Sequence, residues 1–323
     1  MNTLTSASEP LLHIALITFN RAAKLERTLA ALANSCFKDF PFTIYDNAST
    51  DETPFVIEKY RASFARIQVI RHPRNIGGFG NVIRAYSDAI GRFFWLLCDD
   101  DHLHPEYSGE VVAELERDEA DMICINAIGL EGFEPGYRGK IQEVAEKNWR
   151  IFWLGAFLPS TIYRTTLITS SVLHLMLLHG GHYYCQAILM ASCFDANCRV
   201  FIAKPGLMDR EASNDIGTDW VAYTYGWVRS LEDHPIYDTR RIAFWHRFGP
   251  TENWWIITLK SAAYMLAFKQ EKRTAILQMW LDLPAFARAC CVPILAFLCL
   301  PRRALRYMGK RLKTGAGQKL ERS

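Results

Sequence analysis

An uninterrupted apolar run that ends in three carboxylates restricts the fold of this chain more than any other stretch. The run, residues 93–98 (FFWLLC), has no polar face, so it predicts a strand that is buried on both faces of a sheet. Asp99, Asp100 and Asp101 follow at once. Their charges repel one another unless a cation neutralises them, and their oxygen atoms are ligands that Mg²⁺ and Mn²⁺ favour. Because ligands of open α/β sheets bind where strands end, this boundary predicts a ligand site.

The direction of the three acidic side chains follows from the geometry of an extended chain. Side chains at positions 99 and 101 point to one side, and the side chain at position 100 points to the other. The sequence therefore predicts that Asp99 and Asp101 share a metal-bound diphosphate while Asp100 faces elsewhere. The alternative is a solvated acidic turn that caps a helix beginning near Glu106.

Three further strand patterns precede this one, at residues 11–18, 42–45 and 67–71, and each is followed by a polar cluster and a helical pattern. This repetition predicts an α/β fold: a Rossmann-like, mostly parallel central sheet with helices on both faces. Asn20 and Asp51 each precede a helix, so capping is the alternative to a binding role for both. The polar residues at these strand ends and in the clusters include Thr18, Asn20, Arg21, Asp46, Asn47, Asp51 and Asn75.

The charge of the chain is concentrated near its C-terminal end. The net charge is +3, yet residues 302–322 alone contain eight Lys or Arg and one Glu. An apolar stretch of 12 residues, 289–300, comes just before them and is too short for a bilayer span, which needs roughly 20 residues. The combination predicts a peripheral contact with an anionic membrane surface, and a buried helix with a basic end is the alternative. Because the rest of the chain is acidic, we expect no nucleic-acid partner.

The cysteines indicate a reducing compartment. The sequence has nine, with no CxxC pair, and those in or beside apolar runs are predicted to be buried free thiols. The first ten residues lack the pattern of a secretory signal, so we expect a cytoplasmic protein on the cytoplasmic face of a membrane. The predicted buried thiols are Cys36, Cys98, Cys124, Cys193 and Cys299.

Four motifs in this order resemble those of family 2 glycosyltransferases, which have the GT-A fold. They are residues 18–21 (TFNR), 46–51 (DNASTD), 75–78 (NIGG) and 99–101 (DDD). The resemblance is strong over residues 11–110 and continues weakly to about 210. It implies that the site binds a nucleotide-diphosphate sugar, with UDP favoured by analogy, together with Mn²⁺ or Mg²⁺.

The resemblance also implies roles for individual residues. Thr18 and Asn20 would bind the base and ribose, Asp46 would accept a hydrogen bond from the base, and Arg21 would meet phosphate oxygens. Asp99 would face ribose or metal, and Asp101 would hold the ion that stabilises the departing diphosphate. The implied nucleotide-sugar-binding set is Thr18, Asn20, Arg21, Asp46, Asn47, Asp51, Asn75, Asp99 and Asp100, and the implied metal ligands are Asp99 and Asp101.

An inverting transfer needs a base that takes the proton of the acceptor hydroxyl. Residues 153–164 resemble the acceptor-side segment of the family. Where the family often has a Glu-Asp pair, this chain has residues 180–184 (GGHYY), so His182 is the predicted base. A packing or capping role for His182 is the alternative, and Asp209 and Glu211 are rival bases.

The resemblance implies a catalytic GT-A domain at residues 1–211, with a nucleotide-binding half at 11–110 and an acceptor half at 111–211. Residues 212–323 would form a helical, aromatic-rich C-terminal region. The predicted activity is transfer of a sugar to a lipid-linked surface glycan of the O-antigen or capsule type. A nucleotidyltransferase is one alternative, although residues 18–21 are not its glycine- and lysine-rich loop. A catalytically degenerate sugar-nucleotide-binding partner is the other, because the base is not evident.

Overall fold

Over the residues that it describes, the computed structural model has an eight-stranded sheet with covering helices and a separate two-stranded sheet. All described residues lie in one of the two compact units into which the chain divides. The predicted boundary after residue 211 and the predicted helical C-terminal region lie outside the described residues and stay predictions. The residues described are 9–100, 102–125, 130, 132–134, 136–148, 151, 157–178, 186–203 and 207–209.

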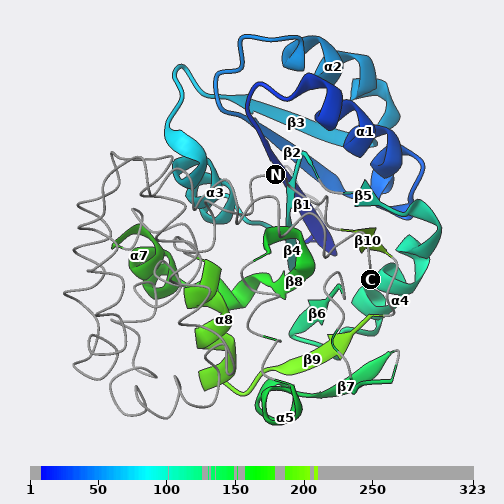
Figure 1. The fold of residues 1–323 in the computed structure, drawn as a ribbon, viewed down its shortest axis with the longest axis vertical. Coiled ribbons are helices and arrows are strands. Elements are labelled where there is room, and N and C mark those ends of the chain that lie inside the picture. Colours follow the sequence, from blue (N-terminus) through cyan, green and yellow to red (C-terminus); the bar gives the residue numbers. More distant parts are fainter. Residues whose placement is uncertain are drawn as a thin grey trace, which may run out of the picture. The chain divides into compact units, whose positions relative to one another are not determined.

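The first four strands form the parallel half of the sheet (Figure 1). They are β1 (Leu12–Thr18), β2 (Pro41–Asp46), β3 (Arg66–Arg71) and β4 (Phe93–Cys98). β1 lies between β2 and β4, β3 pairs with β2, and all three pairings are parallel. The carboxyl ends of these strands therefore share one edge, and the predicted α/β sheet is confirmed.

The other strands extend the sheet beyond β4 and make it mixed. Within the described residues the sheet has eight strands in the order β3-β2-β1-β4-β8-β6-β9-β7. β8 is antiparallel to both β4 and β6, while β9 is parallel to β6 and antiparallel to β7. A separate two-stranded sheet joins β5 and β10. The bounds are β5 His102–Leu103, β6 Met122–Cys124, β7 Tyr137–Lys140, β8 Thr161–Arg164, β9 Arg199–Ile202 and β10 Met208–Asp209.

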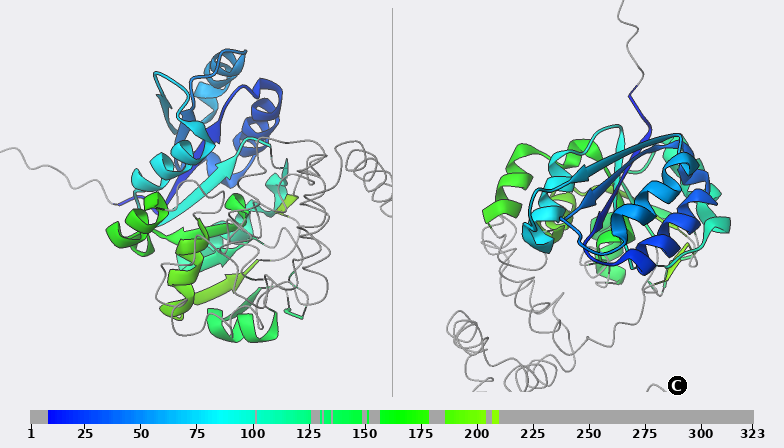
Figure 2. Two further views of the ribbon diagram at one scale, coloured as in Figure 1. Left: turned by 60° about the vertical axis from the view of Figure 1, so that its left-hand side comes forward. Right: turned by 90° about the horizontal axis from the view of Figure 1, so that it is seen from above.

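Helices cover both faces of the parallel half, as the two-sided burial of β4 requires (Figure 2). On one face, Trp95 of β4 belongs to the same buried cluster as Leu29 of α1 and Ile57 of α2. On the other face, Phe94 packs against Tyr86 of α3, with ring centroids 5.5 Å apart. The helices are α1 Ala22–Ala33, α2 Thr53–Tyr60, α3 Gly77–Ser87, α4 Ser108–Arg117, α5 Ile141–Lys147, α7 Ser170–Leu178 and α8 Gln186–Asp195.

The cysteine prediction holds for some positions and fails for one. Cys124 and Cys193 are buried free thiols, as predicted, and Cys98 is half-buried. Cys36 is exposed because it begins a short surface 3₁₀-helix after α1, so the prediction of burial is wrong there. Cys299 lies outside the described residues. In the part of the chain that the structure describes, we find no helix with the length and apolarity of a membrane span.

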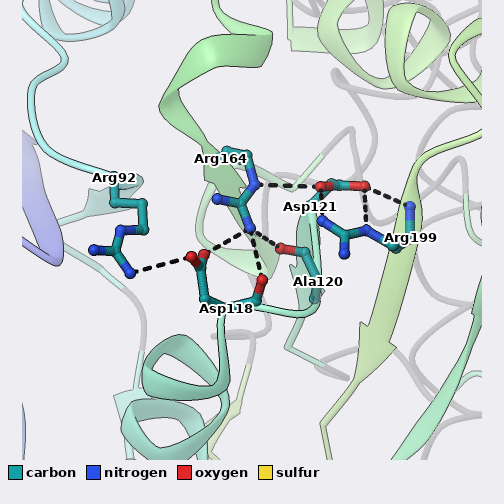
Figure 3. Close-up of polar contacts among 6 residues, drawn as sticks. All are labelled: Arg92, Asp118, Ala120, Asp121, Arg164 and Arg199. Atoms are coloured by element: carbon teal, nitrogen blue, oxygen red, sulfur yellow. Dashed lines mark hydrogen bonds and ion pairs between the residues drawn. The ribbon is translucent and has the colours of Figure 1, made fainter.

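A charge network at the amino end of β4, opposite the acidic loop, joins β4, β8, β9 and the segment before β6. Figure 3 shows its polar contacts. Arg164, the last residue of β8, lies over the ring of Phe93, with 4.7 Å between the guanidinium carbon and the ring centroid. Its Nη2 lies 2.8 Å from Oδ1 of Asp118 and donates to the carbonyl oxygen of Ala120 at 2.9 Å. Its Nε donates to Oδ1 of Asp121 at 3.2 Å. Arg164 thus connects β4, β8 and the segment before β6.

Two more arginines complete the network. The backbone N–H of Arg199 and its Nε both donate to Oδ2 of Asp121, at 2.9 and 3.1 Å. Arg92 pairs with Oδ2 of Asp118 at 3.2 Å. Partial burial acts to raise the pKa of Asp121, but hydrogen bonds from Arg199 and the nearby charge of Arg164 outweigh it and lower that pKa. The carboxylate of Asp121 therefore stays ionised, and together Asp118 and Asp121 bind three arginines.

We expect Arg164→Met to lower the free energy of unfolding by about 2–3 kcal/mol, because it leaves partly buried carboxylate and carbonyl oxygens without a donor. The matched control is Arg199→Met. Its side chain is 48% exposed, against 18% for Arg164, so we expect a loss below about 1 kcal/mol. Urea unfolding of the two variants measures both values. Equal losses would contradict the central position of Arg164.

His13 is a buried, neutral side chain in β1. Its Nε2 lies 2.9 Å from Oγ1 of Thr43, and its Nδ1 accepts a hydrogen bond from the backbone N–H of Ile90 at 3.3 Å. Burial lowers the pKa of His13 to about 4, and the nearby charge of Asp88 only partly opposes this shift. The folded chain therefore excludes a proton that the unfolded chain binds below pH 6.5.

This difference predicts that stability falls as the pH drops from about 6.5 to about 4. Between pH 7 and pH 5 we expect His13 alone to lower the free energy of unfolding by about 2 kcal/mol. Urea unfolding at pH 7, 6 and 5 measures the decrease. The variant His13→Asn keeps an acceptor near the Ile90 N–H and does not titrate. Its free energy of unfolding should therefore fall by about 2 kcal/mol less between pH 7 and pH 5. An identical pH dependence in both proteins would show that His13 is not responsible.

Candidate functional site

A cavity of about 340 Å³ opens at the carboxyl ends of β1 and β4. The loops after β2 and β3 complete its wall. Ligands of open α/β sheets bind at this edge. Five of the predicted binding residues line it: Thr18, Arg21, Asn47, Asn75 and Asp99.

Asp99 is the buried carboxylate of the cavity, with a side chain only 4% exposed. Thr18 Oγ1 donates to its Oδ2 at 2.6 Å, and Arg21 Nη1 donates to its Oδ1 at 3.1 Å. From α1, Oγ1 of Thr28 donates to the backbone carbonyl of Asp99 at 3.1 Å. Burial raises the pKa of Asp99 even though Thr18 and Arg21 favour its ionised form. The first residues after β4 are therefore attached to both β1 and α1.

Asp100 lies on the same side as Asp99, so the predicted opposite orientation is wrong. Its Oδ2 accepts a hydrogen bond from Nη1 of Arg21 at 2.7 Å, and Nζ of Lys24 lies 3.8 Å away. The reason is that β4 ends at Cys98 and the chain turns, so the alternation of an extended strand no longer applies. One guanidinium nitrogen thus contacts both carboxylates.

Asp101 lies outside the described residues, so the predicted ligand pair of Asp99 and Asp101 stays a prediction. Among the residues that the structure does describe, no group of three or more His, Cys, Asp or Glu side chains is placed to hold a metal ion. The oxygens of Asp99 and Asp100 nevertheless converge on a single cationic nitrogen. Hard carboxylate oxygens that meet around one positive charge suit Mg²⁺ or Mn²⁺.

Asp46, at the end of β2, is buried and has partners for both oxygens. Its Oδ1 accepts from the backbone N–H of Ser49 at 2.9 Å, and its Oδ2 lies 3.4 Å from Nε of Arg71. These contacts fix the turn after β2. Because a carboxylate oxygen can accept more than one hydrogen bond, the predicted contact with a base stays open.

Asn47 and Asn75 meet and join the loops after β2 and β3. Nδ2 of Asn47 donates to Oδ1 of Asn75 at 2.9 Å and to the carbonyl oxygen of Gly77 at 3.1 Å. Oδ1 of Asn47 accepts from the backbone N–H of Ile76 at 2.9 Å. Gly77 has φ +81°, which favours glycine at this first position of α3. The start of α3 is therefore held at the cavity wall.

Asn20 does not cap α1, so that interpretation is wrong. Its φ is +52°, and its Oδ1 accepts from the backbone N–H of Thr50 at 2.7 Å. Its own backbone N–H donates to Oγ of Ser49 at 3.0 Å. Asn20 therefore links the loop after β1 to the loop after β2, a contact that depends on residues about 30 positions apart.

Asp51 has the capping role that its position suggests, and it serves two helices. Its Oδ1 accepts from the backbone N–H of Thr53 in α2 at 3.0 Å, and its Oδ2 accepts from that of Ala22 in α1 at 3.1 Å. Slight burial acts to raise the pKa of Asp51, but the hydrogen bonds from Thr53 and Ala22 outweigh it and lower that pKa. Its predicted contact with a nucleotide sugar stays a prediction.

Sequence reasoning missed two supporting residues, Thr28 and Asn81. Thr28 is a buried polar residue on the apolar face of α1, and Asn81 is one on α3, with 5% and 2% exposure. Nδ2 of Asn81 donates to the carbonyl oxygen of Tyr45, and its Oδ1 lies 2.9 Å from Nε2 of His72. The sequence did contain a signal for both: each is a polar residue at a helix position that the apolar pattern predicts to be buried, and a buried polar group needs a hydrogen-bond partner.

The candidate bases are placed only in part. His182 and Glu211 lie outside the described residues. Asp209 is in β10, where its backbone pairs with His102 of β5, three positions beyond Asp99 in the sequence. The main chain of Asp209 therefore runs beside the segment that follows the acidic loop.

The model of Glycosyl transferase family 2 matches residues 13–174, which is half of the chain. The chain therefore belongs to glycosyl transferase family 2, and the predicted family is confirmed. The match includes every predicted binding residue from Thr18 to Asp101.

Two relatives are similar in sequence to part of this chain. Poly(ribitol-phosphate) beta-N-acetylglucosaminyltransferase TarS of Staphylococcus aureus (strain MW2) is 30% identical over 159 residues, 47% of this chain and 27% of TarS. The GalNAc(5)-diNAcBac-PP-undecaprenol beta-1,3-glucosyltransferase of Campylobacter jejuni is 32% identical over 95 residues, 29% of this chain and 31% of that enzyme. The chain thus spans less than a third of the length of either relative.

Solved structures confirm the fold. The crystal structure of S. aureus TarS 1–349 has a TM-score of 0.50 at 18% identity, covering 93% of this chain and 91% of the other. The mannosyltransferase PcManGT of Pyrobaculum calidifontis, solved with GDP-Man and Mn²⁺, has a TM-score of 0.51 at 13% identity, covering 97% and 88%. The predicted GT-A fold, a mostly parallel sheet with helices on both faces, is therefore correct.

The contacts of Asn47 predict a graded effect of substitution. Asn47 is 2% exposed, so Asn47→Ala removes three partly buried hydrogen bonds and should lower the free energy of unfolding by about 2–3 kcal/mol. Asn47→Asp keeps the acceptor for Ile76 and should lose less. Hydrogen exchange gives a second readout: the Ile76 amide should stay protected in Asn47→Asp and exchange faster in Asn47→Ala. Equal exchange in the two variants would contradict this assignment.

Proposed function

We propose that this chain is an inverting, metal-dependent glycosyltransferase that moves a sugar from a nucleoside-diphosphate donor to an acceptor hydroxyl. The observation that carries the proposal is the convergence of four predicted motifs on one cavity. The loops after β1, β2 and β3 and the acidic loop after β4 all contribute to it. Family membership supports the same reaction class, because the matched residues include this whole edge.

The cavity provides different groups for different parts of a donor. A volume of about 340 Å³ suits part of a small ligand. Thr18 and Asn75 offer polar groups at the wall, and Phe19, which is 38% exposed, offers an aromatic face. Arg21 offers a guanidinium that can bind phosphate oxygens in pairs. The UDP complex of TarS 1–349, at a TM-score of 0.50, supports UDP as the first nucleotide to test.

The acidic loop is the proposed position of the divalent ion. Asp99, Asp100 and Asp101 would hold Mn²⁺ or Mg²⁺, which when bound stabilises negative charge on the leaving diphosphate. Thr18 and Thr28 keep Asp99 in place, so this carboxylate does not need the ion to be oriented. The Mn²⁺ and GDP-Man complex of PcManGT supports this choice of cation.

We further propose a lipid-linked acceptor at the cytoplasmic face of a membrane. The C. jejuni relative is, by its name, a glucosyltransferase that acts on an undecaprenol-linked saccharide. In the sequence of this chain, the apolar stretch 289–300 and the basic stretch 302–322 would provide apolar and electrostatic attraction to an anionic surface. A surface glycan of the O-antigen or capsule type is the corresponding product.

A thermal-shift screen tests the donor and the metal together. We expect one of UDP, GDP, dTDP and CDP to raise the unfolding midpoint in the presence of Mn²⁺ and to do so less without it. At a nucleotide concentration 100 times its Kd, the expected stabilisation is about 2.7 kcal/mol. Asp101→Asn should abolish the metal-dependent part.

The control for that screen is Asp39→Asn, which removes the same charge from an exposed position near the opposite end of β2. It should respond like the unmodified chain. If Asp101→Asn keeps the full metal-dependent shift, the metal role of Asp101 is wrong. If no nucleotide shifts the midpoint under any condition, the proposed donor site is wrong, and a degenerate partner protein becomes the better proposal.

The pH dependence of sugar transfer identifies the base. If His182 takes the acceptor proton, kcat/KM should fall about tenfold per pH unit below about pH 6.5, and His182→Gln should lose on the order of 10²–10⁴-fold. If Asp209 is the base, activity should persist to about pH 4–5 and Asp209→Asn should show the loss instead. We expect the first result. A flat profile between pH 7 and 5 would exclude His182.

A further inference from the structure

Arg21 holds the position between the two described carboxylates of the acidic loop. Its Nη1 lies 3.1 Å from Oδ1 of Asp99 and 2.7 Å from Oδ2 of Asp100. The next basic residue on the same side, Lys24, has its Nζ 3.8 Å from that Asp100 oxygen. The start of α1 therefore supplies the positive charge that the acidic pair requires.

The arginine is less firmly held than the carboxylates. Its side chain is 48% exposed and lines the cavity, so solvent reaches the guanidinium, whereas the side chain of its partner Asp99 is only 4% exposed. Asp99, in contrast, has further bonds from Thr18 to its Oδ2 and from Thr28 to its backbone carbonyl. The guanidinium can therefore leave while Asp99 keeps its place.

We propose that Arg21 is a displaceable counter-ion of the acidic loop. It neutralises Asp99 and Asp100 in the unliganded chain and leaves them when a divalent cation binds, because both need the same carboxylate oxygens. The released guanidinium then lies at the cavity with free donors, where it binds phosphate oxygens of the donor. This last contact rests on the proposed nucleotide donor, whereas the exchange between Arg21 and the cation rests only on the proposed cation site at the acidic loop.

The exchange has a thermodynamic consequence. When the cation binds, Arg21 loses its contacts with Asp99 and Asp100, so the cation alone binds weakly. A diphosphate that binds the released arginine gives it new contacts and so offsets part of this loss. Cation and nucleotide should therefore bind cooperatively, and each should strengthen the other by the same factor. Arg21 in this sense couples the binding of two ligands.

The test is calorimetric titration of the full chain with Mn²⁺ and no nucleotide. Arg21→Gln removes the competing charge and should bind Mn²⁺ about tenfold more tightly than the unmodified chain. Lys24→Gln removes a charge that lies farther from Asp99 and Asp100, so its gain in Mn²⁺ affinity should stay below about threefold. Arg21→Lys keeps the charge and should bind Mn²⁺ within about threefold of the unmodified chain.

A second titration adds saturating UDP. In the unmodified chain UDP should tighten Mn²⁺ binding, and in Arg21→Gln most of this gain should disappear. If Arg21→Gln binds Mn²⁺ no more tightly without nucleotide, Arg21 is not a counter-ion in competition with the cation. If Lys24→Gln gains as much affinity for Mn²⁺ as Arg21→Gln, the gain comes from the loss of any nearby positive charge, and the proposal is wrong.

The two arms separate this proposal from the proposed function. If UDP fails to bind the unmodified chain with or without Mn²⁺, the uridine donor is wrong, while the titration without nucleotide still decides the exchange. Because Arg21→Gln retains hydrogen-bond donors at an exposed position, we expect it to fold. Its thermal unfolding midpoint should lie within a few degrees of that of Arg21→Lys. A midpoint lower by more than that would show that Arg21 is a structural tie, which contradicts the proposal.

Discussion

The buried carboxylate of Asp99 is the group on which the candidate site depends. An ionised group placed this deep is costly unless hydrogen bonds compensate it, and Thr18 supplies one at 2.6 Å from the neighbouring strand. That contact is possible only because β1 and β4 pair in parallel and end at the same edge. Thr28 then attaches the same residue to α1 through its backbone carbonyl. Sheet, helix and acidic loop are therefore connected at one position.

The remaining loops of the site are held by short polar side chains. Asn47 joins the loops after β2 and β3, and Asn20 joins the loops after β1 and β2. Asp51 satisfies the first N–H groups of α1 and α2 with one carboxylate. Each of these residues is also a predicted ligand contact. A substitution that weakens ligand binding can thus act through the loops, and only a stability measurement on the same variant separates the two effects.

The sequence was sufficient for the parallel half of the sheet, because runs that are apolar on both faces leave few other possibilities. All four strands there begin and end within one residue of the predicted positions. The antiparallel additions β6 and β8 are only three and four residues long and carry too little periodicity to be recognised. The left-handed backbone of Asn20 depends on Ser49 and Thr50, roughly 30 positions away. The orientation of Asp100 depends on Arg21, roughly 80 positions away. Local patterns contain no record of such contacts.

The two ends of β4 neutralise acidic residues in different ways, and the difference supports a function at only one of them. At the amino end, Asp118 and Asp121 bind three arginines, and Arg164 among them is only 18% exposed and also contacts Phe93. That network ties strands together, and none of its residues lines the cavity at the carboxyl end. At the carboxyl end, Asp99 and Asp100 share one half-exposed guanidinium beside a cavity. A carboxylate pair that served stability alone would gain from the first arrangement. The second leaves the charges available to a ligand, as the proposed cation site requires.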